Sequence, residues 1–155
     1  MSTVQLNRKV PAFSAATTGG KTIKLSDFKG KNLVLYFYPR DNTPGCTTEG
    51  QDFRDHYRQF KRLDTEVLGV SRDSLASHEK FRAKQDFPFE LLSDEDEKLC
   101  RLFDVIREKN MYGRKVMGIE RSTFLIDANG KLRREWRKVR VKGHVEEVLE
   151  AVREL

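Results

Sequence analysis

Apolar residues recur along the chain in short runs whose spacing predicts alternating strands and helices. The run at residues 32–38 (NLVLYFY) is continuous and rich in strand-forming residues, which is typical of a strand buried on both faces. Residues 66–70 (EVLGV) and 122–126 (STFLI) have the same character. Turn residues lie at 17–20 (TTGG) and 127–130 (DANG). Weaker strand signals occupy residues 10–13, 22–25, 89–92 and 131–139.

Between these strands, apolar positions at helical spacing predict amphipathic helices. One helix follows a polar loop at residues 39–46, and a second spans residues 74–87 with Ser74 as its N-cap. Ser93 is expected to cap a third helix, and a fourth closes the chain. The apolar positions that define the first, third and fourth helices are Phe53, Tyr57, Phe60 and Leu63; Leu99, Leu102 and Phe103; and Val145, Val148, Leu149 and Val152.

This order of elements predicts an α/β fold with a mixed central sheet flanked by helices. The 155 residues contain no internal repeat or low-complexity linker, so we expect one domain over residues 1–155. The polar loop begins at Pro39, at the carboxyl end of the most apolar strand. Open α/β sheets carry their functional sites at that end, so the loop is the candidate site.

The charge balance is positive, with 30 Lys and Arg against 24 Asp and Glu. Such a balance is compatible with a nucleic-acid partner. The densest basic cluster, residues 131–142, alternates with apolar residues, so we interpret it as the solvated face of a strand. A site for an anionic partner is the alternative, but no helix-turn-helix, zinc-finger or aromatic RNA-binding motif supports it.

Other bulk properties point to a cytoplasmic protein. No apolar stretch approaches the roughly 20 residues of a membrane helix, and residues 1–11 lack the apolar run of a signal peptide. Two cysteines form no disulfide framework and suit a reducing compartment. The three histidines, His56, His78 and His144, show no metal-ligand spacing, so we expect neither a metal nor a cofactor.

The segment Thr43-Pro44-Gly45-Cys46 has a chemical interpretation of its own. Thr43 suits an N-cap and Pro44 the first helical position, so Cys46 falls at the third. Unpaired backbone N–H groups and the helix dipole favour a thiolate there. Full ionisation gains only about 30-fold in thiolate at pH 7, so a fast reaction also needs donors that orient the substrate and stabilise charge.

Pro39-x-x-x-Thr43-x-x-Cys46 resembles the active-site signature of the peroxiredoxins. The longer pattern is similar to the bacterioferritin comigratory protein, or peroxiredoxin Q, subfamily. It consists of residues 37–39 (FYP), 43–47 (TPGCT) and Glu49. The resemblance covers nearly the whole chain and includes residues 91–94 (LLSD) and 121–127 (RSTFLID).

The resemblance implies a thioredoxin-like fold and the reduction of hydrogen peroxide and organic hydroperoxides. Cys46 matches the peroxidatic cysteine, whose thiolate attacks the peroxide and becomes a sulfenic acid. Thr43 matches the residue whose hydroxyl contacts thiolate and peroxide, and Arg121 the arginine that polarises the substrate and holds the thiolate. Pro39 shields the sulfur, and Glu49 orients the arginine. One Thr43 hydroxyl cannot serve fully as both cap and catalytic contact, and we favour the catalytic contact.

The chain departs from the family in its second cysteine. Many relatives carry a resolving cysteine five residues after the first, where this chain has Gln51, and others carry it in the following helix, where residues 74–87 contain none. Cys100 is either a small buried core residue or, after local unfolding, a resolving cysteine. We therefore expect a one-cysteine cycle with thioredoxin, glutaredoxin or glutathione as the reductant, in a monomer or weak dimer.

Two other functions compete with peroxide reduction. A thioredoxin-like thiol-disulfide oxidoreductase would share the fold, but it needs a second thiol three residues after the first, where Glu49 stands. A non-enzymatic role, either as a basic binding module or as a redox-regulated chaperone, has little motif support.

Overall fold

The structure, a computed structural model, describes residues 4–155, so the first three residues of the segment inspected for a signal peptide lie outside it. Its strands are β1 (Ser14–Thr17), β2 (Lys21–Lys24), β3 (Asn32–Phe37), β4 (Thr65–Ser71), β5 (Leu91–Ser93), β6 (Ile106–Met111), β7 (Arg114–Ile119), β8 (Ser122–Ile126) and β9 (Leu132–Trp136). Its helices are the one-turn η1 (Leu25–Phe28), α1 (Pro44–Arg62), α2 (Leu75–Gln85), α3 (Lys98–Leu102) and α4 (His144–Arg153).

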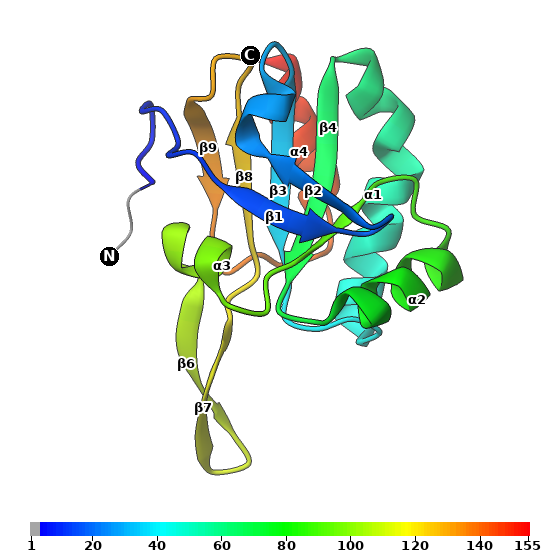
Figure 1. The fold of residues 1–155 in the computed structure, drawn as a ribbon, viewed down its shortest axis with the longest axis vertical. Helices are drawn as coiled ribbons and strands as arrows, with labels where there is room; N and C mark the ends of the chain where they lie inside the picture. Colours follow the sequence, from blue (N-terminus) through cyan, green and yellow to red (C-terminus); the bar gives the residue numbers. More distant parts are fainter. Residues whose placement is uncertain (1–3) are drawn as a thin grey trace.

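Seven of the strands form one sheet in the order β2-β1-β5-β4-β3-β8-β9 (Figure 1). The β3–β4 and β4–β5 pairs are parallel, and the remaining pairs are antiparallel. Parallel neighbours need a crossover connection, and α1 and α2 supply the two crossovers. The predicted α/β fold with a mixed central sheet is confirmed.

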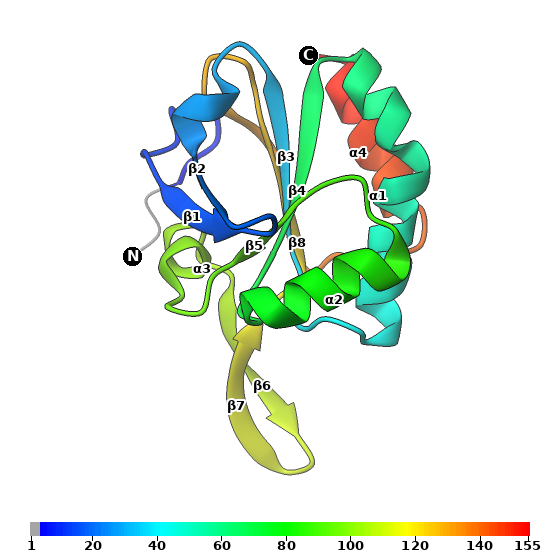
Figure 2. The ribbon, with the colours of Figure 1, turned by 45° about the vertical axis from the view of Figure 1, so that its right-hand side comes forward.

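β3 is buried on both faces, as its apolar run predicts. Residues 33–37 are each at most 1% exposed. Val34 and Tyr36 belong to one core, together with side chains of α1, α2 and α4. Leu33, Leu35 and Phe37 belong to a second core that includes side chains of α3 and η1. Figure 2 shows α1, α2 and α4 on one side of the sheet and α3 with η1 on the other.

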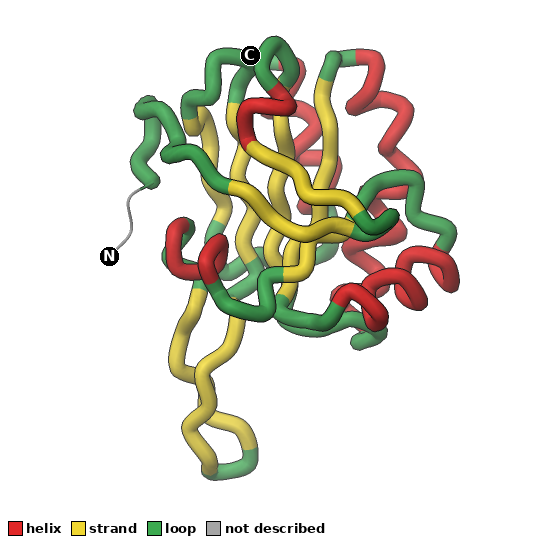
Figure 3. The backbone as a smooth tube through the Cα atoms, in the orientation of Figure 1, coloured by secondary structure: helices red, strands yellow, loops and turns green. Residues whose placement is uncertain are grey.

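The hairpin β6–β7 was not predicted. Its strands pair with each other in a separate two-stranded sheet that projects from the body (Figure 3). Most of its residues are exposed or half-buried, and only Gly118 and Ile119 are buried. Hydrophobic patterning detects strands that face a core, and this hairpin presents almost no side chain to one.

Two strand predictions were displaced. The first extended segment was expected at residues 10–13, but β1 begins at Ser14; within the expected segment, Pro11 has no N–H to donate to a ladder. The strand expected over residues 131–139 ends at Trp136. Lys138 has a left-handed backbone with φ of 50°, which breaks the extended conformation.

One of the two predicted serine caps is confirmed. The Ser74 hydroxyl accepts the N–H of Ser77 at 3.1 Å at the start of α2. Ser93 does not cap α3; the Asp94 carboxylate accepts the N–H groups of Leu99 and Cys100 at 3.0 and 2.8 Å. A carboxylate here satisfies two helix donors at once.

The basic cluster lies partly on β9, which ends the sheet order. The guanidinium of Arg133 pairs with Asp127 at 3.2 Å, and that of Arg134 with Glu154 at 3.8 Å. Charged side chains on an edge strand discourage pairing with another sheet, so this geometry favours the solvated strand face. Within residues 4–155, no helix has both the length and the apolar character required to cross a bilayer.

Candidate active site

Cys46 lies at the third position of α1. The preceding residues set this position: Thr43 has extended backbone angles at the N-cap, and Pro44 fits the first helical position because it lacks an N–H. The first helical hydrogen bond runs from Thr47 N–H to Thr43 O at 2.9 Å. The Cys46 side chain is almost fully buried, with 2% of the residue exposed. The sulfur therefore sits beside the positive end of a helix dipole in a site with little water.

Arg121 contacts this sulfur although it lies 75 positions further along the sequence. Its Nη2 donates to Cys46 Sγ at 3.4 Å. The sheet register explains the approach, because Ser122 of β8 pairs with Phe37 at the end of β3, next to the loop that leads into α1. Gly45 leaves room for the guanidinium, since a Cβ at this position would lie 3.1 Å from Arg121 Nη2.

Glu49 holds the other side of the guanidinium. It lies one helical turn after Cys46, on the same face of α1, and its Oε1 accepts from Arg121 Nη1 at 2.6 Å. Its side chain is fully buried, whereas that of Arg121 is 16% exposed. Among the described residues, Glu49 Oε2 has no hydrogen-bond partner. The structure thus joins Cys46, Arg121 and Glu49 in one chain of contacts.

Burial sets the charge balance of this group. It raises the pKa of Glu49 to about 7, because desolvation of the carboxylate outweighs the attraction of Arg121. Burial also opposes the charge on Arg121, but Glu49 and Cys46 overcome it and raise the pKa of the guanidinium. The raised pKa of Glu49 favours its neutral form, whereas the raised pKa of Arg121 favours its charged form. Arg121 therefore stays charged near neutral pH, whereas Glu49 titrates there.

Thr43 and Pro39 lie beside the site without a described contact to the sulfur. The Thr43 side chain does not cap α1; its hydroxyl donates to Arg40 O at 2.8 Å. Its oxygen keeps lone pairs that can accept a further hydrogen bond. Pro39, Arg40 and Thr43 line one wall of a cavity of about 780 Å³ whose far wall is the β6–β7 hairpin. The cavity gives a small molecule a route to the loop.

Cys100 lies far from this arrangement in the fold. It is fully buried in the core on the α3 side of the sheet, whereas Cys46 belongs to the core on the α1 side. Burial and a hydrogen bond with Asp94 raise the pKa of its thiol well above the usual range. Both cysteines are free. The folded chain therefore offers Cys46 no second thiol, as a thioredoxin-like exchange reaction would need.

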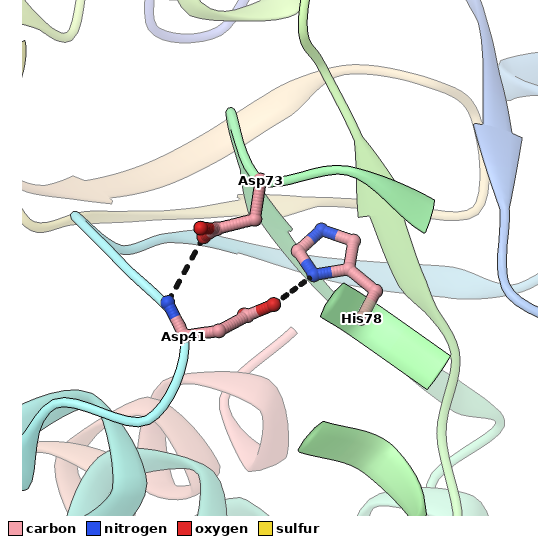
Figure 4. A group of neighbouring side chains, drawn as sticks. All are labelled: Asp41, Asp73 and His78. Atoms are coloured by element: carbon pink, nitrogen blue, oxygen red, sulfur yellow. Dashed lines mark hydrogen bonds and ion pairs between the residues drawn. The ribbon is translucent and has the colours of Figure 1, made fainter. Parts of the chain in front are cut away.

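Sequence patterning missed one polar cluster next to the site. Asp41, Asp73 and His78 bring three potential ligand atoms within 4.8 Å of one another, the one such group found in residues 4–155 (Figure 4). From the sequence, His78 was predicted only to be one of three scattered histidines without metal-ligand or catalytic spacing. The available signal was that His78 lies in the first turn of α2, one residue after Ser77 and four after the N-cap Ser74. This places His78 at the end of α2 that follows β4, but it does not indicate the contact with Asp41, 37 positions away.

Comparison with known proteins identifies the family. Residues 6–135 match the model of the AhpC/TSA family. The chain is 51% identical to peroxiredoxin Bcp of Bacillus subtilis over 153 residues, which cover 99% of this chain and 98% of the relative. It is 55% identical to peroxiredoxin Bcp of Xanthomonas campestris over 136 residues, which cover 88% and 85%.

Solved structures agree. A structure of peroxiredoxin Q from Xanthomonas campestris superimposes with a TM-score of 0.90 at 49% identity, covering 99% of this chain and 97% of that one. The bacterioferritin comigratory protein of the same organism, solved in work on its alkyl peroxide reduction activity, gives a TM-score of 0.89 at 48% identity and covers 99% and 98%. The chain belongs to the AhpC/TSA family, and within it to the peroxiredoxins of the bacterioferritin comigratory protein or peroxiredoxin Q type. It is a thiol peroxidase with a thioredoxin-like fold.

Proposed function

We propose that Cys46 is the peroxidatic cysteine of this enzyme and that it reduces hydrogen peroxide and organic hydroperoxides. The observation that carries the proposal is the approach of Arg121 Nη2 to Cys46 Sγ at 3.4 Å, with Glu49 holding the same guanidinium at 2.6 Å. Alkyl peroxide reduction, described for the Xanthomonas campestris relative, supports the organic substrates.

The reaction follows from these groups. The Cys46 thiolate attacks the nearer peroxide oxygen, the S–O bond forms as the O–O bond breaks, and the electron pair leaves on the second oxygen. That oxygen takes a proton from solvent and departs as water or an alcohol, while the sulfur becomes a sulfenic acid. Arg121 lies where negative charge moves from sulfur to the departing oxygen, so its guanidinium stabilises the transition state.

Thr43 and Pro39 complete the proposed site. The Thr43 oxygen accepts a hydrogen bond from the peroxide, and its hydroxyl keeps the loop shape through Arg40 O. Pro39 has no N–H to compete for the substrate and covers the approach to the sulfur. Glu49 is a positioning residue, since its carboxylate holds the guanidinium in the plane that reaches Cys46.

The cycle closes with an external thiol. A thiol attacks the sulfenic acid, releases water and forms a mixed disulfide, which a second thiol reduces. Thioredoxin, glutaredoxin and glutathione are the candidate reductants, and Cys100 takes no part. We further propose that residues 1–155 act as one domain, as a monomer or weak dimer, in the cytoplasm.

The test compares Cys46→Ser with Cys100→Ser in stopped-flow peroxide consumption. We expect Cys46→Ser to abolish turnover and Cys100→Ser to retain it. Mass spectrometry after one equivalent of peroxide should find a sulfenic acid on Cys46. Near-normal turnover in Cys46→Ser would overturn the assignment, and a Cys46–Cys100 disulfide would overturn the one-cysteine cycle.

A further inference from the structure

A buried polar network joins the loop before α1 to helix α2. The loop, residues 38–43, is called the active-site loop below. Asp41 lies at its centre and His78 in the first turns of α2, and their side chains are 2% and 0% exposed. His78 Nδ1 lies 2.7 Å from Asp41 Oδ2, and Figure 4 marks this contact with a dashed line. Fully desolvated polar groups persist only where their hydrogen bonds are satisfied.

The contacts of the histidine fix the orientation of its ring. Its Nε2 lies 2.9 Å from the backbone oxygen of Leu92. A carbonyl oxygen only accepts, so Nε2 carries a hydrogen. Its Nδ1 faces the Asp41 carboxylate, which also accepts from the hydroxyls of Tyr38 at 2.7 Å and Ser77 at 2.8 Å. Both ring nitrogens of His78 are therefore engaged: Nε2–H donates to Leu92 O, and Nδ1 shares a hydrogen bond with Asp41 Oδ2.

The same contacts argue against a metal ion. A metal needs a free lone pair on the imidazole, and both ring nitrogens of His78 are already engaged in hydrogen bonds. Asp73 is engaged as well, because its Oδ2 accepts from the backbone N–H of Asp41 at 2.9 Å and from the hydroxyl of Ser71. The cluster is a closed hydrogen-bond network rather than a set of vacant ligands.

The network determines the shape of the active-site loop. Asp41 is bound through its side chain to α2 and through its backbone N–H to Asp73, just beyond β4. Asn42, the next residue, has a left-handed backbone with φ of 63°, so the chain turns sharply between this anchor and Thr43. The anchored position of Asp41 therefore sets where Pro39 and Thr43 lie relative to Cys46.

We propose that His78 is a positioning residue for peroxide reduction, acting through Asp41 on the active-site loop. This inference rests on the proposed function and adds a residue that never touches the substrate. Among the three side chains that hydrogen-bond to the Asp41 carboxylate, His78 also bonds through Nε2 to Leu92 O of β5, so it links the active-site loop to the central sheet as well as to α2.

The first test replaces the histidine with two side chains. His78→Leu fills most of the space but donates nothing, whereas His78→Asn keeps an amide donor near the place of Nδ1. We expect His78→Leu to lower the rate constant for sulfenic acid formation by about 10- to 100-fold, the cost of misplacing catalytic groups by about 1 Å. His78→Asn should recover most of that loss.

A second readout separates positioning from a general effect on the sulfur. Alkylation of Cys46 by iodoacetamide needs a reactive thiolate but not the hydrogen bond between Thr43 and the peroxide. The alkylation rate should therefore stay within about threefold of wild type in both His78 variants, a difference too small to explain the loss of peroxide rate. Equal losses in both reactions, or equal peroxide rates in His78→Leu and His78→Asn, would overturn the proposal.

A milder matched pair covers the case in which His78→Leu does not fold. Tyr38→Phe removes one hydroxyl that donates to Asp41 at 2.7 Å, and Tyr57→Phe removes one that donates to Glu66 at the same distance. We expect Tyr38→Phe to slow the peroxide reaction by about 3- to 10-fold and Tyr57→Phe to change it by less than about twofold. Equal effects would refute the proposed role of the network. If Cys46→Ser remained active, the proposed function would fail instead, whatever the His78 variants did.

Discussion

Replacing Arg121 tests the site most directly. Arg121→Met keeps the aliphatic part of the side chain but removes the donors to Cys46 Sγ and Glu49 Oε1. The buried Glu49 carboxylate then loses its described partner. Because the pKa of Glu49 is already about 7 with the arginine present, we expect this carboxyl to take up a proton in the variant.

The expected loss of rate exceeds what thiolate formation alone explains. An ordinary cysteine thiol with a pKa of about 8.5 is about 3% ionised at pH 7, so an arginine that only ionised the sulfur would contribute at most about 30-fold. The guanidinium also lies 3.4 Å from Sγ, where charge moves during the reaction. Removing one such preorganised donor costs about 100- to 1,000-fold, and we expect Arg121→Met to lose that much.

The assay is the second-order rate constant for sulfenic acid formation by stopped flow, in a Cys100→Ser background. The double variant Arg121→Met/Glu49→Gln checks that the loss is not due to an unpaired carboxylate, and it should react as slowly as Arg121→Met alone. Arg153→Met removes an equal charge from a side chain that is 45% exposed on α4 and should change the rate by less than about twofold. A loss below about 30-fold that disappears at high pH would refute the transition-state role.

Three further outcomes follow from the buried groups. The pKa of Glu49 rises from 4.5 to about 7 on folding, so the folded chain retains a proton that the unfolded chain releases, and stability should fall as the pH rises between these values. In urea denaturation, Glu49→Gln should remove this dependence, roughly 3 kcal/mol in all; an unchanged slope would contradict it. Gly50→Ala should lower stability by about 1–3 kcal/mol in thermal unfolding, since its Cβ would lie 2.3 Å from Phe87 Cζ. Peptide mapping after iodoacetamide should find Cys46 modified and Cys100 intact, because burial and Asp94 raise the pKa of the Cys100 thiol well above its usual range, so it has almost no reactive thiolate; modification of both would refute this.

Local signals were enough to predict the elements that carry the sulfur. The apolar run of β3, the break at Pro39 and the Thr43-Pro44 start of α1 all act over a few residues, and together they put Cys46 at the third helical position. The approach of Arg121 is different, because it depends on the antiparallel register of β8 on β3. Its candidacy came from the family resemblance, since a contact between residues 75 positions apart leaves no periodic trace.

The polar network around His78 escaped prediction for a related reason. Hydrophobic patterning assigns polar residues to the surface, and Asp41 stands in a loop made almost entirely of them. Asp41 and His78 are buried because each satisfies the other, a condition that exists only after α2 has packed against the loop. The hairpin β6–β7 escaped prediction for the opposite reason. Its two strands pair their backbone N–H and C=O groups with each other, so they need no apolar face against a core.

These observations bear on how the cycle closes. A resolving cysteine in the helix after the active site would have to reach the sulfenic acid of Cys46, so α2 and the active-site loop would have to move relative to each other. In this chain α2 has no cysteine, and it supplies both His78 and Ser77 to the carboxylate that holds the active-site loop. Helix α2 carries no thiol and is instead held to the active-site loop by these hydrogen bonds. An external thiol can instead approach the active-site loop through the cavity that Pro39 and Thr43 line. The missing cysteine and the buried network thus favour the same one-cysteine cycle.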